Sequence, residues 1–306
     1  MTAETGRVRR ADSHRPPAET RIGISGWRYA PWRGVFYPKK LAQRLELHYA
    51  SRELNTIEIN GSFYSLQRPE SYQAWHEETP DDFVFSVKGN RYITHVRRLQ
   101  DAKPLLANFF GSGVLHLRRT LGPFLWQLPP SLRYDGERLE DFFRLLPRTF
   151  AQAARLTAAA DRVEPDLPDP LPRRRLRHAV EVRHHSFETP EFVELARKHD
   201  VAVVFADTAG KWPYFEDLTS DFVYARLHGE IELYKSGYDD DSLRWWARRI
   251  RLWQSGRQAG DAVTMSALKP RRVRRDIYVY FDNDVKVRAP FDAARLHRML
   301  IRSSRP

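Results

Sequence analysis

Thr56-Ile-Glu-Ile-Asn60, followed directly by Gly61-Ser-Phe-Tyr64, is the stretch from which the fold of this chain can be worked out. Side chains alternate between the two faces of a β-strand, so Glu58 and Asn60 share one face and two isoleucines occupy the other. A face that carries a carboxylate and an amide does not suit packing against a hydrophobic core. The stretch therefore predicts a strand whose polar face lines a cavity.

Seven other segments have the composition of buried strands, and helical sequence separates nearly all of them. Alternating strands and helices predict parallel pairing, and eight such units predict a closed (β/α)8 barrel, the TIM-like α/β fold. The rival, a doubly wound open sheet, lacks support because no Gly-rich dinucleotide fingerprint follows the first strand. The seven segments are residues 21–27, 83–88, 124–128, 179–183, 201–206, 222–228 and 277–281.

The helical segments follow from apolar residues at helical spacing. The longest of them is an amphipathic helix expected over residues 139–160. The others are expected at residues 41–51, 70–78, near 104–110 and beyond, 190–198, 241–253 and 290–301.

One barrel domain is expected over residues 21–303, with two segments that stand outside the strand and helix pattern. Residues 1–20 are basic, contain few apolar groups and are expected to be disordered. A Pro- and Arg-rich insert at about residues 161–177 shows no globular pattern and is expected to run over the surface.

Composition narrows the functional classes. The absence of cysteine excludes disulfide scaffolds, zinc–thiolate sites, iron–sulfur clusters and cysteine nucleophiles. The first 20 residues lack the apolar core of a signal peptide, and no apolar run reaches membrane-span length, so we expect a cytoplasmic protein without membrane contact. The net charge of +12 keeps nucleic acid open as a partner. The oligomeric state stays open.

The ends of the predicted strands carry polar side chains in nearly every unit. Active sites of (β/α)8 barrels lie at the C-terminal ends of the strands, so these residues predict a site at the barrel mouth. The alternative is that they only neutralise one another, as Glu58 with Arg226 or Glu181 with Arg183. The residues are Ser25, Glu58, Asn60, Ser86, Lys88, Gln127, Glu181, Arg183, Asp207, Arg226, His228 and Asn283.

Roles within this set follow from residue chemistry. A carboxylate, Glu58 or Glu181, is expected to be the catalytic base, and His228 the acid or proton carrier, because imidazole titrates near neutral pH. Asp207 is a further candidate catalytic residue. Lys88, Arg183 and Arg226 would bind a phosphate or carboxylate. The remaining substrate-binding candidates are Trp27, Asn60, Tyr64, His95, Gln127, His184 and Asn283.

A divalent metal is possible, although no cofactor is favoured. Carboxylates and imidazole could hold the ion, but the sequence has no HxH or HExxH spacing and the neighbouring arginines oppose a cation. The residues concerned are Glu58, Glu181, Asp207 and His228.

Seven motifs spread over about residues 21–300 resemble the YecE-like family, also called domain of unknown function 72. This resemblance implies a TIM-barrel fold and brings no assigned activity. Ser62 stands where the family has threonine, and Asp282 stands where asparagine is usual. The motifs are SGWRYAPWRGVFYP (25–38), NTIEINGSFY (55–64), TPDDFVFSVKGNRYITH (79–95), FLWQLPPSL (124–132), VEVRHHSF (180–187), YARLHG (224–229) and VYFDND (279–284).

Three functions are compatible with the sequence. The first is an enzyme that applies carboxylate and imidazole acid–base chemistry to a small anionic, sugar- or nucleotide-like compound. The second is a nucleic-acid binding or processing protein that grips phosphates at the barrel mouth and stacks aromatic side chains on bases. The third is a non-catalytic ligand sensor.

Overall fold

The computed structural model describes residues 18–234, 236–283 and 286–302. Eight strands, all parallel, form a closed barrel in which each strand pairs with the next and β8 pairs with β1. The predicted TIM-like barrel is confirmed. The strands are β1 (Thr20–Ser25), β2 (Thr56–Ile59), β3 (Val84–Lys88), β4 (Leu121–Gln127), β5 (His178–Glu181), β6 (Ala202–Asp207), β7 (Phe222–Leu227) and β8 (Asp276–Phe281).

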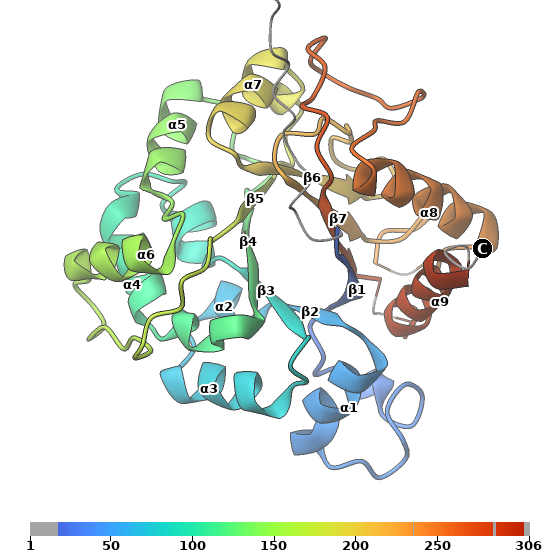
Figure 1. Ribbon diagram of the computed structural model, residues 1–306, viewed down its shortest axis with the longest axis horizontal. Coiled ribbons are helices and arrows are strands. Elements are labelled where there is room, and N and C mark those ends of the chain that lie inside the picture. The colour runs from blue at the N-terminus through green and yellow to red at the C-terminus, as the bar shows by residue number, and fades with distance from the viewer. Residues whose placement is uncertain (1–17, 235, 284–285, 303–306) are drawn as a thin grey trace, which may run out of the picture.

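The helices lie around the outside of the strands (Figure 1). Helices connect most successive strands, and each connection returns the chain to the start of the next parallel strand. The helices are α1 (Glu46–Glu53), α2 (Gly61–Tyr64), α3 (Pro69–Glu78), α4 (Ala102–Gly111), α5 (Gly136–Leu145), α6 (Phe150–Leu156), α7 (Pro190–Lys198), α8 (Asp240–Gln254) and α9 (Ala289–Arg302).

The single long helix predicted over residues 139–160 is wrong. The chain forms α5 and α6 there, separated by four residues that include Pro147. Proline lacks an N–H and clashes with the preceding turn, which ends α5. Thr149 then begins α6, because its side chain accepts a hydrogen bond from the Gln152 amide.

Two layers of apolar side chains hold the barrel together. The larger layer lies between strands and helices and contains residues such as Trp126 and Phe205. The smaller layer fills the barrel interior with residues such as Val204, Tyr224 and Tyr280. Side chains that point into the barrel recur every second residue along a strand. On several strands, the inward residue that follows this apolar layer therefore lies at the mouth of the barrel.

The predicted insert runs along the surface beside α4. Asp166 donates its backbone N–H to the Gly111 carbonyl, and its carboxylate lies 2.6 Å from His116 Nε2. Of the tail expected to be disordered, residues 1–17 lie outside the described residues, whereas Thr20 already belongs to β1. Within the described chain, no helix is long and apolar enough to cross a membrane.

Candidate functional site

A fully buried arginine, Arg226 from β7, lies at the centre of the barrel mouth. Its guanidinium donates to both oxygens of Glu58, at 2.9 and 3.1 Å. It also donates to Glu181 Oε2 at 2.8 Å, to Asp282 Oδ2 at 2.9 Å and to Ser25 Oγ at 3.2 Å. We call these five residues, together with His228, the Arg226 cluster. They come from β1, β2, β5, β7 and β8 or the residue after each strand, so the closed barrel brings them together.

The layer below supports Glu58 from the barrel interior. Tyr224 Oη donates to Glu58 Oε2 at 2.6 Å, and Ser25 Oγ donates to Glu58 Oε1 at 2.5 Å. Asn60 donates its amide to Ser25 Oγ at 2.9 Å. Glu58 therefore has hydrogen-bond donors on both oxygens and is held in one position.

A second arginine, Arg183, extends the network towards β4. Its Nε donates to Glu181 Oε1 at 2.7 Å and its Nη2 donates to Gln127 Oε1 at 3.0 Å. The guanidinium stacks on the Trp212 ring, 3.7 Å from the ring centre. Both ion pairs named as alternatives in the sequence, Glu58–Arg226 and Glu181–Arg183, are therefore present.

The imidazole of His228 lies between Arg226 and Asp282. Its Nε2 lies 3.3 Å from Arg226 Nη1, which can only donate, and its Nδ1 lies 3.0 Å from Asp282 Oδ2. These contacts fit the neutral tautomer that carries its proton on Nδ1. The rings of Trp212 and Tyr234 cover the imidazole edge to face. The ring is fully buried.

Lys88, from the end of β3, differs from the arginines in its surroundings. Its side chain is only 8% exposed, and its ammonium lies 4.4 Å from the centre of the Phe63 ring. Phe63 in turn packs edge to face against His95, with ring centres 5.0 Å apart. Among the described residues, the ammonium makes neither a hydrogen bond nor an ion pair. This ammonium is therefore free to contact a ligand.

Burial and neighbouring charge set the protonation of these groups. Burial, reinforced by Arg226, lowers the pKa of Lys88 to about 8. Burial, reinforced by Lys88 and Arg183, lowers the pKa of His95 to about 4, so its imidazole is neutral at pH 7. Burial alone would raise the pKa of Glu181, but Arg183 and Arg226 outweigh burial and hold this pKa far below its usual range.

Metal binding is restricted by Arg226, whose guanidinium occupies the space between the carboxylates of Glu58, Glu181 and Asp282. Across the described part of the chain, no three His, Asp or Glu side chains cluster so as to hold a metal ion.

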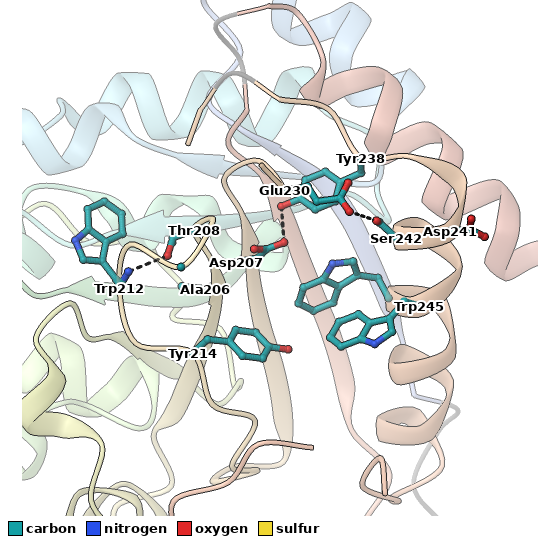
Figure 2. Close-up of a pocket in the computed structure, with 12 residues that line it drawn as sticks. Ala206, Asp207, Thr208, Trp212, Tyr214, Glu230, Tyr238, Asp241, Ser242 and Trp245 are labelled. Atoms are coloured by element: carbon teal, nitrogen blue, oxygen red, sulfur yellow. Dashed lines mark hydrogen bonds between the residues drawn. The ribbon is translucent and has the colours of Figure 1, made fainter. Parts of the chain in front are cut away.

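Asp207 does not join the Arg226 cluster. On β6 the inward residue is Ala206, so the next side chain points outward, towards α8. There Asp207 lines a cavity of about 570 Å³ between β6 and α8, and Tyr238 Oη donates to its carboxylate at 2.9 Å (Figure 2). Asp207 lies outside the barrel because side chains on β6 alternate between the two faces of the strand.

Four of the substrate-binding candidates lie apart from the Arg226 cluster. Trp27 packs in the outer layer against Trp75, with ring centres 5.3 Å apart. His184 accepts a hydrogen bond from the Ser186 amide at the start of a short 3-10 turn. Asn283 donates to Asp292 on α9. Tyr64 is 70% exposed. The structure brings together Glu58, Asn60, Lys88, Gln127, Glu181, Arg183, Arg226 and His228, with His95 beside Lys88.

Three residues of the site were missed as site residues in the sequence. Tyr224 and Asp282 were detectable, because each lies two residues from another inward residue on β7 or β8. Trp212 belongs to a loop, and no sequence period places a loop side chain over Arg183.

Comparison with solved structures supports the fold. A DUF72 family protein from Thermotoga maritima MSB8 superposes with a TM-score of 0.68 at 24% identity, covering 92% of this chain and 99% of that chain. A DUF72 family protein from Enterococcus faecalis V583 superposes with a TM-score of 0.64 at 14% identity, covering 92% and 95%.

Sequence comparison identifies the family. The protein YecE of Escherichia coli K12 is 30% identical over 141 residues, which is 40% of this chain and 49% of that protein. The protein YunF of Bacillus subtilis is 30% identical over 115 residues, covering 36% and 39%. These alignments span less than half the length of either relative. The model of the family described as "Protein of unknown function DUF72" matches residues 21–306, so this chain belongs to the DUF72 family.

Proposed function

We propose that the protein is an enzyme that binds a small anionic compound at the barrel mouth and transfers protons with Lys88 and His95. The observation that carries the proposal is the ammonium of Lys88. It is buried at the mouth end of β3 and contacts no acceptor among the described residues. Burying a charge without a partner costs several kcal/mol (about 3 or more), so a bound anion would stabilise it.

The anion would lie between Lys88 and Arg183. Arg183 uses Nε and Nη2 within the protein, which leaves Nη1 without an acceptor among the described residues. An ammonium and a guanidinium N–H together suit the oxygens of a carboxylate or phosphate. Lys88 and Arg183 both act on His95 electrostatically, so these three groups surround one side of the mouth.

Proton transfer requires groups that are not already held in ion pairs within the protein. The sequence assigned the base to Glu58 or Glu181, but both carboxylates contact Arg226 at 2.8–2.9 Å. They suit a positioning role, in which they fix Arg226 and, through Glu181, Arg183. Lys88 has a pKa of about 8 and His95 one of about 4. A bound anion would raise both pKa values, which leaves Lys88 as a proton donor and moves the pKa of His95 towards neutral pH.

The apolar surface beside Lys88 suits a sugar- or nucleotide-like ring. Phe63 lies under the ammonium, and Tyr64, next to it, is exposed with its ring 5.1 Å from Phe63. Ring faces of this kind pack against the flat or apolar side of a small ligand.

The test is a panel of phosphorylated sugars, nucleotides and small carboxylates, measured by calorimetry for binding and by mass spectrometry for turnover. Lys88→Met should abolish binding. Lys88→Arg should keep binding but lose turnover, because a guanidinium keeps the charge and does not give up its proton. Equal binding and turnover in Lys88→Met and the wild type would overturn the proposal.

The same panel separates the two other functions. Binding without turnover, unchanged in Lys88→Arg, would identify a ligand sensor. Binding that scales with oligonucleotide length and weakens steeply with salt would identify a nucleic-acid protein.

A further inference from the structure

The cavity beside Asp207 lies at the same end of the barrel as the Arg226 cluster, on the outer side between β6 and α8, and we call it the α8 pocket. Its volume of about 570 Å³ is within the usual range of small-molecule sites. It is lined by Ala206, Asp207, Thr208, Gly210, Trp212, Tyr214, Glu230, Tyr238, Asp241, Ser242, Trp245 and Trp246.

The α8 pocket contains carboxylates and no lining lysine or arginine. Asp207 accepts a hydrogen bond from Tyr238, and Glu230 accepts one from Ser242 (Figure 2). No ion pair joins either carboxylate to a cation within the described residues. This is unusual for a chain with 51 Lys and Arg against 39 Asp and Glu. Asp241, at the rim, is already paired with Arg244 at 2.6 Å.

Aromatic rings form the remaining wall. Trp246 meets Trp245 and Tyr214 edge to face, at ring-centre distances of 5.0 and 6.5 Å. Figure 2 shows Asp207 and Tyr214 directed from the β6 side towards Trp245 on α8. Carboxylates above an aromatic wall suit a ligand with a positive group and an apolar body.

The cations near these rings do not neutralise the pocket. Arg249 stacks on Trp245 at 3.5 Å, but its guanidinium pairs with Glu216 and Asp261 at 3.0 and 3.3 Å. Arg183 stacks on Trp212 and pairs with Glu181. Lys211 lies 5.2 Å from the centre of the Trp212 ring, but it is exposed and does not line the pocket.

We propose that the α8 pocket binds an organic ammonium ion, with Asp207 and Glu230 facing the charge and the aromatic wall facing the apolar body. The site is separate from the Arg226 cluster, because Trp212 lies between them, with Arg183 on its ring and its own side chain lining the pocket. The proposal does not depend on the proposed function at the mouth.

Protonation of Asp207 supplies a pH dependence. Burial, with a contribution from Glu230, raises the pKa of Asp207 to about 6. The other titratable groups facing it are Tyr238, Tyr214 and Asp241. An ammonium ligand should therefore bind more weakly as the pH falls below about 6, where Asp207 loses its charge.

The experiment compares benzylammonium with benzyl alcohol, which has the same ring and no charge, by calorimetry on the full chain. Benzylammonium should bind and benzyl alcohol should bind at least about tenfold more weakly. Asp207→Asn should weaken benzylammonium binding by about tenfold or more, and Glu230→Gln provides a second variant if the first does not fold. The exposed-helix control Asp141→Asn should bind as the wild type does.

Two results would overturn the proposal: equal binding of benzylammonium and benzyl alcohol, or unchanged binding in both pocket variants. Lys88→Met should leave benzylammonium binding intact, since Lys88 lies in the barrel interior. Loss of anion binding at the mouth therefore cannot be confused with loss of cation binding in the α8 pocket.

Discussion

The Arg226 cluster and the α8 pocket lie at the same end of one barrel and are opposite in charge balance. In the cluster every carboxylate contacts a guanidinium, and beside it the ammonium of Lys88 makes no hydrogen bond or ion pair with the described residues. In the pocket the carboxylates of Asp207 and Glu230 make no ion pair with a cation in the part of the chain that the structure describes. Neighbouring strands β6 and β7 contribute to the two regions because successive side chains point to opposite faces. The ends of two neighbouring strands therefore contribute to two regions on opposite faces of the barrel wall.

Replacing the central arginine should have the largest effect. Arg226→Met leaves the buried carboxylates of Glu58 and Glu181 and the part-buried carboxylate of Asp282 without their shared partner, so the free energy of unfolding should fall by about 3–5 kcal/mol. Urea denaturation at pH 7 measures it. The control is Arg144→Ala, which removes an exposed pair with Glu140 and should cost less than about 1 kcal/mol. Similar losses in both variants would show that the cluster is not a buried charge network.

Replacing Lys88 should raise the free energy of unfolding, whereas replacing Arg226 should lower it. Its pKa is lowered from 10.5 to about 8, so between these values the unfolded chain binds more protons than the folded protein. The stability contribution of this group therefore rises with pH across that window, by up to about 3 kcal/mol. Lys88→Met should be more stable than the wild type at pH 7, and the difference should shrink towards pH 10.5. A difference that does not change with pH would contradict the assignment.

Asp207 should give a smaller effect in the acid range, and its contribution to stability should change with pH in the opposite direction to that of Lys88. Its pKa is raised from 3.8 to about 6, so its contribution to stability is fully present below 3.8 and is lost as the pH rises through 6. Asp207→Asn should therefore be more stable at pH 7 by about 2 kcal/mol, a value reduced for partial exposure, and equal to the wild type below pH 3.8. Unfolding curves at both pH values decide between these outcomes.

The smallest effect is expected from the basic surface at the opposite end of the barrel. Arg271 lies there with Ser220, Asp221 and Arg275, beside the starts of β7 and β8. The double substitution Arg271→Gln and Arg272→Gln should change stability by less than about 0.5 kcal/mol and leave both ligand sites unaffected. A large loss of mouth-ligand affinity would show that the two ends are coupled.

The sequence was sufficient for the barrel and for part of the site. Alternation along 56–60 and 179–183 predicted inward polar residues, and the pairs Glu58–Arg226 and Glu181–Arg183 are both present. It was not sufficient for helix 139–160, where Pro147 divides the chain into two helices. Asp207 was grouped with the interior residues from its place at a strand end, although its neighbour Ala206 is the inward residue.

What the sequence determined by itself is local: the two-residue period of each strand, the helical spacing between strands and the polar residues at strand ends. Only the tertiary structure decided which charges are satisfied. Arg226 meets Glu58, Glu181 and Asp282 because barrel closure brings β2, β5 and β8 around β7. Lys88, at an equivalent strand end, meets none of them, because contact depends on distances between side chains from different strands. The residue pattern of a single strand or helix cannot predict those distances.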